Sequence, residues 1–218
     1  MAKPYEQHCS LAHALDLVGE RWTLLIVREL LAGPRRYGDL AAGLVTVPSN
    51  ILAARLKQLE SSGLVRQRRL DPPAHAVAVY EVTELGEGLA GPVTELARWG
   101  MRTLPPTRDG RSFQSHWLVV ALQARFEQSA AAKVNVDETY EFRIEGDDTV
   151  HFEVSGGEGT ARVGAASGKP AVVVAADADT FLELSAGAIT PPEAIERGAY
   201  IEAEQPAAIE RMRAVLPA

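Results

Sequence analysis

Residues 45–69, VTVPSNILAARLKQLESSGLVRQRR, decide how the first half of this chain is interpreted. Pro48 stands where a helix can begin, because the N–H that proline lacks would have no helical partner there. The apolar side chains that follow recur at helical spacing: Leu52, Leu56 and Leu59. Gly63 ends this repeat, and residues 64–70 are expected to form a strand. The stretch carries five basic residues and a single acid, Glu60.

The charge of the chain is distributed unevenly. The whole chain has a formal net charge of −7, made up of +1 over residues 1–104 and −8 over residues 105–218. Residues 35–69 alone hold seven basic and two acidic side chains. A phosphate backbone would interact with this local patch and not with the average charge, so the asymmetry indicates different partners for the two halves.

The segments around the opening stretch predict a winged helix-turn-helix. Apolar spacing predicts helices at 11–18, 20–33 and 36–44, and residues 64–70 and 76–82 read as two strands around a turn, DPPAH. Thr83 is a plausible cap for a long helix through residue 104, in which Pro92 marks either a kink or the true start. A short helix, a turn, a longer helix and a two-stranded ribbon follow one another in the order of that fold.

The exposed side of the helix at 49–62 is the candidate surface for reading DNA. Its first turn offers backbone N–H groups to phosphate, and Ser49 and Asn50 can reach bases or phosphates. Ala53 and Lys57 project away from the leucines, and Arg55 lies on the flank. Three residues of the ribbon are further candidates: Arg66, Arg68 and His75. The alternative is that the polar residues are ordinary caps, the leucines ordinary core and the charges a solvated surface.

The second half predicts a separate α+β domain. Residues 105–111 form the expected linker, between a domain at 1–104 and a domain at 112–218. A helix is expected at 115–126, strands at 139–146, 148–156, 159–165 and 169–176, and then three helices, at 177–187, 191–198 and 207–216. GGEG at 156–159 reads as a hairpin turn. The sequence has no G-x-S-x-G, zinc signature or complete phosphate-binding loop, so we expect no enzyme, metal or cofactor.

The bulk composition is that of a globular chain. With 218 residues and 46% hydrophobic side chains, it can bury one or two cores. Its one cysteine rules out an internal disulfide and fits a reducing compartment. The N-terminus lacks a signal-peptide pattern, and no apolar run approaches the roughly 20 residues that span a bilayer. We therefore expect a cytoplasmic protein without a membrane partner.

Three segments together resemble the HxlR family of bacterial winged-helix regulators: CSLAHALDLVGERWTLLIVRELLAGPRRYGDLAAGL (9–44), ILAARLKQLESSGLV (51–65) and YEVTELGEGLAGPVTELARWG (80–100). Tyr37 stands where the family often has Phe, Val82 where it often has Leu, and V-T-V-P-S replaces the usual G-I-S turn. The resemblance implies a DNA-binding homodimer on a pseudo-palindromic operator, with Arg36 and Arg55 near the DNA backbone. Arg36 can alternatively be a plain surface charge.

Cys9 occupies a position at which some members of this family sense oxidants or electrophiles. A neighbouring imidazolium such as that of His8 would lower the pKa of its thiol. Because the chain has no second cysteine, a switch would need a Cys9–Cys9 bond between subunits or a small-molecule adduct. The alternative, which we favour from the sequence, is a small buried hydrophobe at a helix start.

Residues 112–217 resemble a sterol carrier protein type 2-like domain. The resemblance rests on a strand after a glycine hairpin, D-A-D-T-F-L-E-L-S-A-G, P-E-A-I-E-R-G, a short strand and a terminal helix; Glu204-Gln205 replaces the usual Gly-Asp. It implies a mainly antiparallel five-stranded sheet with an apolar tunnel for a lipid-like effector. Candidate lining residues, which can equally be plain core, are Trp117, Phe126, Phe152, Phe181, Leu184 and Ile189.

The sequence as a whole predicts an α+β transcriptional regulator. We expect a repressor, since occupying a promoter is enough to block it, with the C-terminal domain sensing an apolar effector or reinforcing the dimer. The alternatives are a lipid-like carrier whose helix-turn-helix serves assembly, or a redox regulator acting through Cys9.

Overall fold

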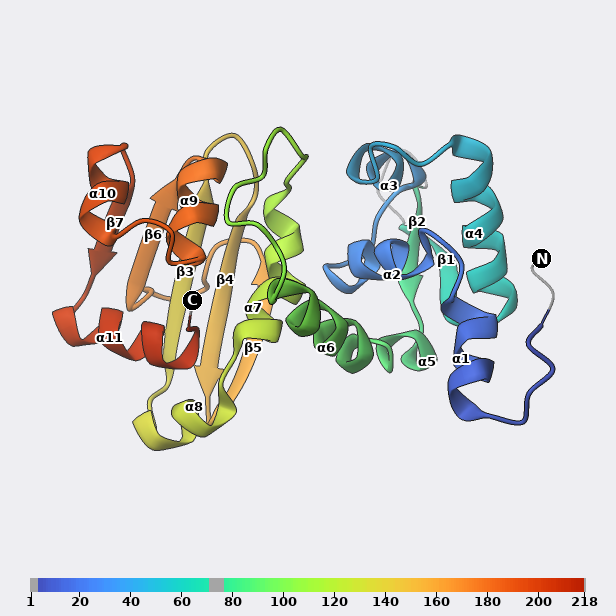
Figure 1. Cartoon of the computed structure of the whole chain (residues 1–218), viewed down its shortest axis with the longest axis horizontal. Coiled ribbons are helices and arrows are strands. Elements are labelled where there is room, and N and C mark those ends of the chain that lie inside the picture. Colours follow the sequence, from blue (N-terminus) through green and yellow to red (C-terminus); the bar gives the residue numbers. More distant parts are fainter. Residues whose placement is uncertain (1–3, 71–76, 218) are drawn as a thin grey trace. The chain divides into compact units, whose positions relative to one another are not determined.

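A computed structural model describes residues 4–70 and 77–217 of the chain (Figure 1). The chain divides into two compact units, Met1–Val93 and Thr94–Ala218. The boundary falls inside helix α6, which covers Ala90–Met101. Each unit has its own core, and each is described by itself below.

The first unit is a winged helix-turn-helix, as the sequence predicted. Its helices are α1 (Ser10–Val18), α2 (Thr23–Leu31), α3 (Tyr37–Gly43), α4 (Ser49–Ser61) and the short α5 (Glu84–Glu87). Strands β1 (Val65–Leu70) and β2 (Val77–Val82) pair antiparallel, from Val65 opposite Val82 to Leu70 opposite Val77. We call this ribbon the wing. The expected DPPAH turn at its tip lies outside the described residues.

The core of the first unit forms where α2, α3 and α4 bring their apolar sides together. Leu52, Leu56 and Leu59 of α4 are 0–1% exposed, which confirms the predicted buried side of this helix. Ile26 and Val27 of α2 are equally buried. Fully burying one such side chain stabilises the fold by about 1.5–3 kcal/mol, so this contact holds α4 in place against α2.

Thr83, which directly follows β2, is hydrogen-bonded to the residues that directly precede β1. Its N–H donates to Leu64 O at 3.0 Å, and its hydroxyl donates to Gly63 O at 2.6 Å. The same hydroxyl accepts the N–H of Gly86 at 3.1 Å, which caps α5. A Cβ added at position 86 would lie 2.0 Å from Leu64 O, so only glycine allows this approach.

The long helix predicted after Thr83 is in fact two helices. α5 ends at Glu87, and α6 begins at Ala90 with Pro92 in its first turn. Proline is tolerated there because its missing N–H has no helical partner in the first turn. Of the two roles expected for Pro92, marking a start is therefore the correct one.

The second unit is an α+β domain. It contains the turn η1 (Ser115–Trp117), the helices α7 (Leu118–Arg125), α8 (Gln128–Val134), α9 (Ala178–Ser185), α10 (Pro191–Glu196) and α11 (Pro206–Val215), and one sheet. The strands are β3 (Glu138–Ile144), β4 (Thr149–Ser155), β5 (Glu158–Val163), β6 (Val172–Ala176) and β7 (Tyr200–Ala203), in the order β5-β4-β3-β6-β7. Every neighbouring pair is antiparallel except β3 and β6, which confirms a mainly antiparallel five-stranded sheet. Helix α8 was not expected from the sequence, because its residues show no apolar period.

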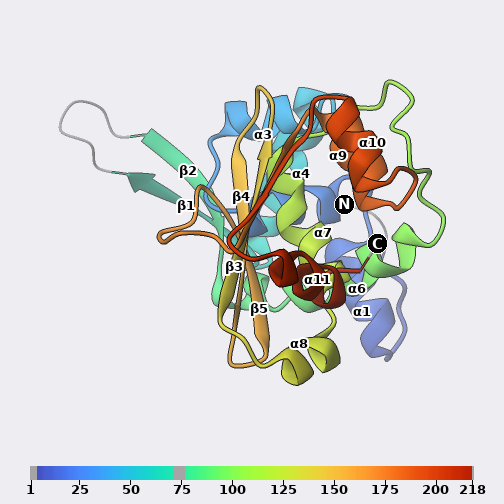
Figure 2. The same ribbon diagram turned by 90° about the vertical axis from the view of Figure 1, so that its left-hand side faces the viewer.

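The helices of the second unit cover one face of this sheet (Figure 2). Alternate residues of β3 and β4 face the helices and are buried: Tyr140, Phe142, Ile144, Val150, Phe152 and Val154. The other face of β3 and β4 is polar, and Arg143, His151 and Glu153 lie on it. The β4–β5 hairpin turns at Gly156 and Gly157, whose φ values of 58° and 81° are those of the expected tight turn.

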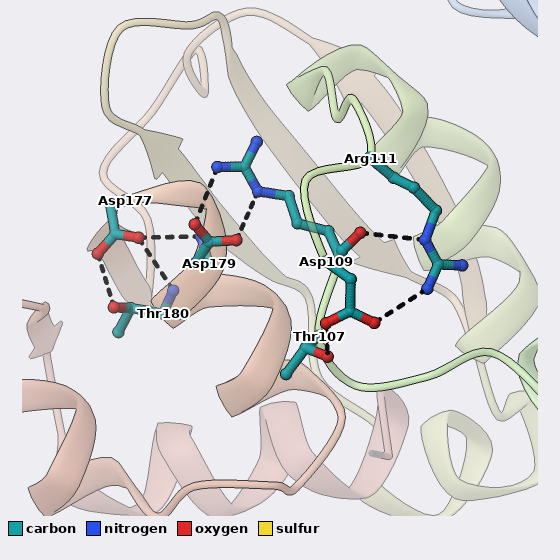
Figure 3. A network of polar contacts seen from close by, with 7 residues as sticks. Thr107, Asp109, Arg111, Asp177, Asp179 and Thr180 are labelled. Atoms are coloured by element: carbon teal, nitrogen blue, oxygen red, sulfur yellow. Dashed lines mark hydrogen bonds and ion pairs between the residues drawn. The ribbon is translucent and has the colours of Figure 1, made fainter.

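The N-terminus of α9 is fixed by acidic side chains (Figure 3). The carboxylate of Asp177 accepts the N–H groups of Asp179 and Thr180 at 2.9 and 3.0 Å, and hydrogen bonds from Thr180 lower the pKa of Asp177. Arg108 donates through Nη2 to Asp179 at 2.9 Å, which lowers the pKa of that carboxyl group. Arg108 lies in segment 105–111, whose role as a linker stays a prediction.

Candidate nucleic-acid interface

Helix α4 presents a polar surface opposite its buried leucines. Ser49, Asn50, Ala53 and Lys57 are all exposed, as the sequence predicted from the helical period. Ala53 adds almost no bulk at the middle of this surface, so the helix backbone can approach another molecule closely. The arrangement offers short hydrogen-bonding groups at the N-terminal end and one exposed cation about two turns further on.

The start of α4 is open to an acceptor from outside. Pro48 is the N-cap residue, and no side chain of the described residues caps the helix. The unit fixes this end in another way, because the Tyr37 hydroxyl of α3 donates to Ser49 O at 2.9 Å. The hydroxyl that distinguishes Tyr37 from the family's usual Phe thus joins the two helices at the start of α4, where Ser49 and Asn50 are exposed.

Two candidate arginines have different surroundings. Arg36 is exposed at the start of α3, where its backbone N–H donates to Asp39 Oδ2 at 3.0 Å and its side chain stays at the surface. Arg55 instead donates through Nη2 to Glu20 at 2.6 Å and through Nη1 to Gln58 at 2.8 Å. Only 17% of its side chain is exposed, so its charge is already matched inside the unit.

The wing brings two predicted arginines together on one face. Arg66 and Arg68 are two residues apart on β1 and therefore point to the same side. Their side chains are 64% and 47% exposed. Between them lies Glu81 of β2, which accepts Arg66 Nε at 2.7 Å and Arg68 Nε at 2.9 Å. These hydrogen bonds lower the pKa of the Glu81 carboxyl group. His75, the remaining wing candidate, lies outside the described residues.

Sequence reasoning missed Tyr37 and Glu81 as parts of this surface. In the sequence Tyr37 is only a departure from the family pattern, yet its hydroxyl binds the start of α4. Glu81 lies opposite Arg66 once the register of the two strands is known. Strand alternation alone could have placed Arg66 and Arg68 on one face, but the register of the ribbon was needed to find their shared acid.

Cys9 is exposed, so the sequence-based preference for a buried cysteine was wrong. It is the N-cap residue of α1, and the backbone N–H groups of Ala12 and Leu11 at the start of that helix lower the pKa of its thiol. The cause is the start of the helix and not the imidazole of His8, which the sequence had suggested. An accessible thiol of this kind holds more thiolate at neutral pH than a free cysteine does.

The candidate ligand residues of the second unit differ in burial. Phe152, Phe181 and Ile189 are buried, whereas Trp117, Phe126 and Leu184 are partly exposed. Phe126 and Phe152 pack with ring centroids 5.4 Å apart. A Cβ added at Gly159 would lie 2.5 Å from the ring of Phe152, so this glycine makes room for the pair. Phe181 packs against Phe142 at 5.8 Å, and Trp117 against Phe113 at 6.2 Å.

Two further properties concern only the described residues, 4–70 and 77–217. No group of three or more His, Cys, Asp or Glu side chains among them is arranged to hold a metal ion. None of their helices is both long and apolar enough to cross a bilayer.

Fold and surface together define a winged helix-turn-helix protein with a second, sheet-containing unit. Residues 17–108 match the HxlR-like helix-turn-helix family, and residues 120–200 match the SCP-2 sterol transfer family. The chain is 33% identical to the HTH-type transcriptional regulator YvaP of Bacillus subtilis over 43% of its own length and 86% of that protein. It belongs to the HxlR family, and both predicted resemblances are confirmed.

Other similar proteins carry the same kind of name. An HTH-type transcriptional regulator of Mycobacterium tuberculosis is 43% identical over 44% of this chain. The match covers 60% of that relative, so the chain spans less than two thirds of its length. The solved structure of the reduced form of the transcriptional regulator YodB from Bacillus subtilis is 29% identical, covers 46% of this chain and 98% of its own, and gives a TM-score of 0.40.

The position of Cys9 predicts how its reactivity depends on pH. Because the first N–H groups of α1 favour the thiolate, alkylation by iodoacetamide should reach half its maximal rate at a lower pH in the folded chain than in urea. The chain's single cysteine makes the reaction specific, and mass spectrometry measures it. Coincident folded and unfolded profiles would show that the start of the helix does not activate this thiol.

Proposed function

We propose that the chain is a DNA-binding transcriptional regulator whose residues 1–104 read an operator and whose residues 112–218 form a ligand-binding or dimerisation domain. The exposed surface of α4 carries the proposal, because Ser49, Asn50, Ala53 and Lys57 stand opposite a fully buried leucine side. Membership of a helix-turn-helix family whose curated relatives are named transcriptional regulators supports it.

The proposed mode of binding places α4 in the major groove and the wing on the phosphate backbone. Ser49, Asn50 and Ala53 approach the bases, and Lys57, Arg36, Arg66 and Arg68 contact phosphates. Arg55 contacts phosphate only if it leaves Glu20, so it is the weakest member of the proposed set. His75, which lies outside the described residues, stays a proposed contact to DNA. Promoter occupancy by such a protein represses transcription.

Replacing Lys57 with Ala should weaken DNA binding at every sequence. Lys57 is exposed and is expected to neutralise one phosphate, so the slope of log K against log salt should fall by about 0.9. Fluorescence anisotropy with the DNA upstream of the chain's own coding sequence measures both quantities. Lys133→Ala, an exposed lysine of the second unit, is the matched control and should change neither. An unchanged slope for Lys57→Ala would remove this residue from the interface.

A homodimer is the second part of the proposal. α1 exposes Leu11 and Leu15, and α6 separately exposes Leu96 and Trp99, the last at 64%. Large apolar side chains exposed on helices are typical of surfaces that another protein covers. A two-fold dimer would present two copies of α4 to half-sites one helical turn apart, which gives the operator its pseudo-palindromic form.

Replacing Trp99 with Glu should shift the dimer toward monomer. A charge buried at an interface without a partner costs several kcal/mol, which is enough to dissociate a dimer at micromolar concentration. Light scattering after size exclusion measures the mass. Ile195→Glu, which changes a similarly exposed apolar residue of α10, should leave the mass unchanged. A dimer that survives Trp99→Glu would place the contact elsewhere.

The third part of the proposal is an apolar effector bound by the second unit. Its aromatic pairs and the match to a sterol transfer family support this reading. Such an effector would favour a dimer whose reading helices are misaligned and would thereby release the operator.

Replacing Leu184 with Arg should block uptake of a fluorescent fatty acid. Leu184 is partly buried on α9, where a guanidinium would meet the apolar ligand at a cost of several kcal/mol. Fluorescence titration measures uptake, and Ile195→Arg is the exposed control. If neither the wild-type chain nor the variants take up the probe, the unit has a structural or dimerising role instead.

The same experiments test two alternative functions. A lipid-like carrier whose helix-turn-helix serves assembly would take up the fatty acid but show no salt-dependent DNA binding. A redox regulator requires a reactive Cys9, and the exposed thiol with its lowered pKa favours this second candidate. The alkylation profile tests its premise.

A further inference from the structure

One acid on the wing is shared by two arginines. Arg66, Arg68 and Glu81 form a cluster that we call the wing clamp. Glu81 stands directly opposite Arg66 in the ribbon and diagonal to Arg68, which lies opposite Val79. Each carboxylate oxygen accepts one Nε–H, at 2.7 Å from Arg66 and 2.9 Å from Arg68. A single carboxylate therefore fixes the direction of both guanidinium groups.

Within the wing clamp, the side chain of Glu81 is much less exposed than those of Arg66 and Arg68. The Glu81 side chain is 12% exposed, whereas those of Arg66 and Arg68 are 64% and 47% exposed. The acid thus lies beneath the two cations, and the cluster as a whole keeps one net positive charge. Each guanidinium uses its Nε–H on Glu81, and the structure shows no partner among the described residues for the four N–H bonds of its terminal nitrogens.

The positions of Arg66 and Arg68 along β1 suit a regular anion array. Residues two apart on a strand lie about 6.7 Å apart and point to the same side. Neighbouring phosphates along one strand of DNA repeat at a comparable distance. The pair of terminal nitrogens on each guanidinium can bind two oxygens of one phosphate side by side.

We infer that Glu81 is a positioning residue for DNA binding, which holds Arg66 and Arg68 so that their terminal nitrogens meet two successive phosphates of one strand. This inference rests on the proposed DNA-binding function. It adds to the residues that support DNA binding one whose charge has the same sign as that of DNA. Glu81 contributes by ordering its neighbours before the complex forms, because long side chains that are already ordered lose less freedom on binding.

Replacing Glu81 with a neutral residue has two expected effects on the affinity for DNA, and they are opposite in sign. Loss of a negative charge near phosphates would strengthen binding if charge alone mattered. Loss of the clamp would free two long side chains, whose ordering on binding corresponds to about a tenfold decrease in affinity. The sign of the change therefore distinguishes positioning from simple repulsion.

The test compares Glu81→Gln with Glu87→Gln. Both changes remove one negative charge from the first unit, but Glu87 is an exposed residue of α5 outside the clamp. A duplex enriched by the wild-type chain from a random-sequence pool serves as the probe, and anisotropy at fixed salt gives the affinity. We expect Glu81→Gln to bind about tenfold more weakly and Glu87→Gln to bind as well as the wild type or better.

A variant that lacks both arginines shows whether the loss of DNA affinity caused by Glu81→Gln depends on them. With Arg66 and Arg68 both replaced by Ala, Glu81→Gln should cause no further loss of affinity at low salt, and the removed charge can only strengthen binding. Glu81→Asp provides a second test at constant charge, because its shorter side chain cannot reach both Nε groups and should also weaken binding. Circular dichroism melting checks that each variant is folded.

Each outcome decides the inference. Equal or tighter binding by Glu81→Gln overturns it, and so does a loss that persists without the two arginines or a Glu81→Asp chain of wild-type affinity. If the wild-type chain enriches no duplex and shows no salt-dependent binding, the proposed function itself fails and the inference fails with it. Normal binding by the wild type with no loss on substitution refutes the positioning role alone.

Discussion

The burial of three leucines on α4 is the constraint on which the first unit depends. Leu52, Leu56 and Leu59 have essentially no exposure, and their contact with α2 fixes the rotation of α4 about its own axis. Once this side is inside, the helical period forces Ser49, Asn50, Ala53 and Lys57 outward. The surface that can read DNA thus follows from packing and needs no separate device to orient it. Tyr37 adds a further constraint, because its hydroxyl donates a hydrogen bond to Ser49 O at the start of α4.

The wing depends on a second close contact, at its base. Thr83 and Gly86 bring the end of β2 and the start of α5 against the carbonyl of Leu64, where no larger residue than glycine fits at position 86. This contact sets the register from Val65 opposite Val82 onward. Register in turn places Glu81 opposite Arg66 rather than on the other face of the ribbon. A one-residue slip would separate the acid from both arginines.

Features with a local cause could be predicted from the sequence, and features that depend on contacts between distant segments could not. The leucine period, the Gly156-Gly157 turn and the acidic cap at Asp177 are set by neighbouring residues. The Arg55–Glu20 ion pair joins residues 35 positions apart, so the sequence could only show Arg55 as a free cation. Helix α8 was missed because QSAAAKV has too few apolar residues for a period to be seen. Cys9 looked like a core residue because small apolar side chains often are, yet its position before α1 leaves it exposed.

The pairing of β3 has a consequence for how the second unit forms. This central strand pairs antiparallel with β4, which follows it in sequence, and parallel with β6, which comes only after two further strands and a long loop. The β3–β4–β5 meander can therefore assemble from local contacts, while β6 must close a much larger loop before it gains any pairing. Until β6 docks, one edge of β3 has unpaired backbone groups beside the apolar side chains of Tyr140 and Phe142. The completion of the sheet is thus the slow step expected in folding, and the chain is most exposed to aggregation just before it.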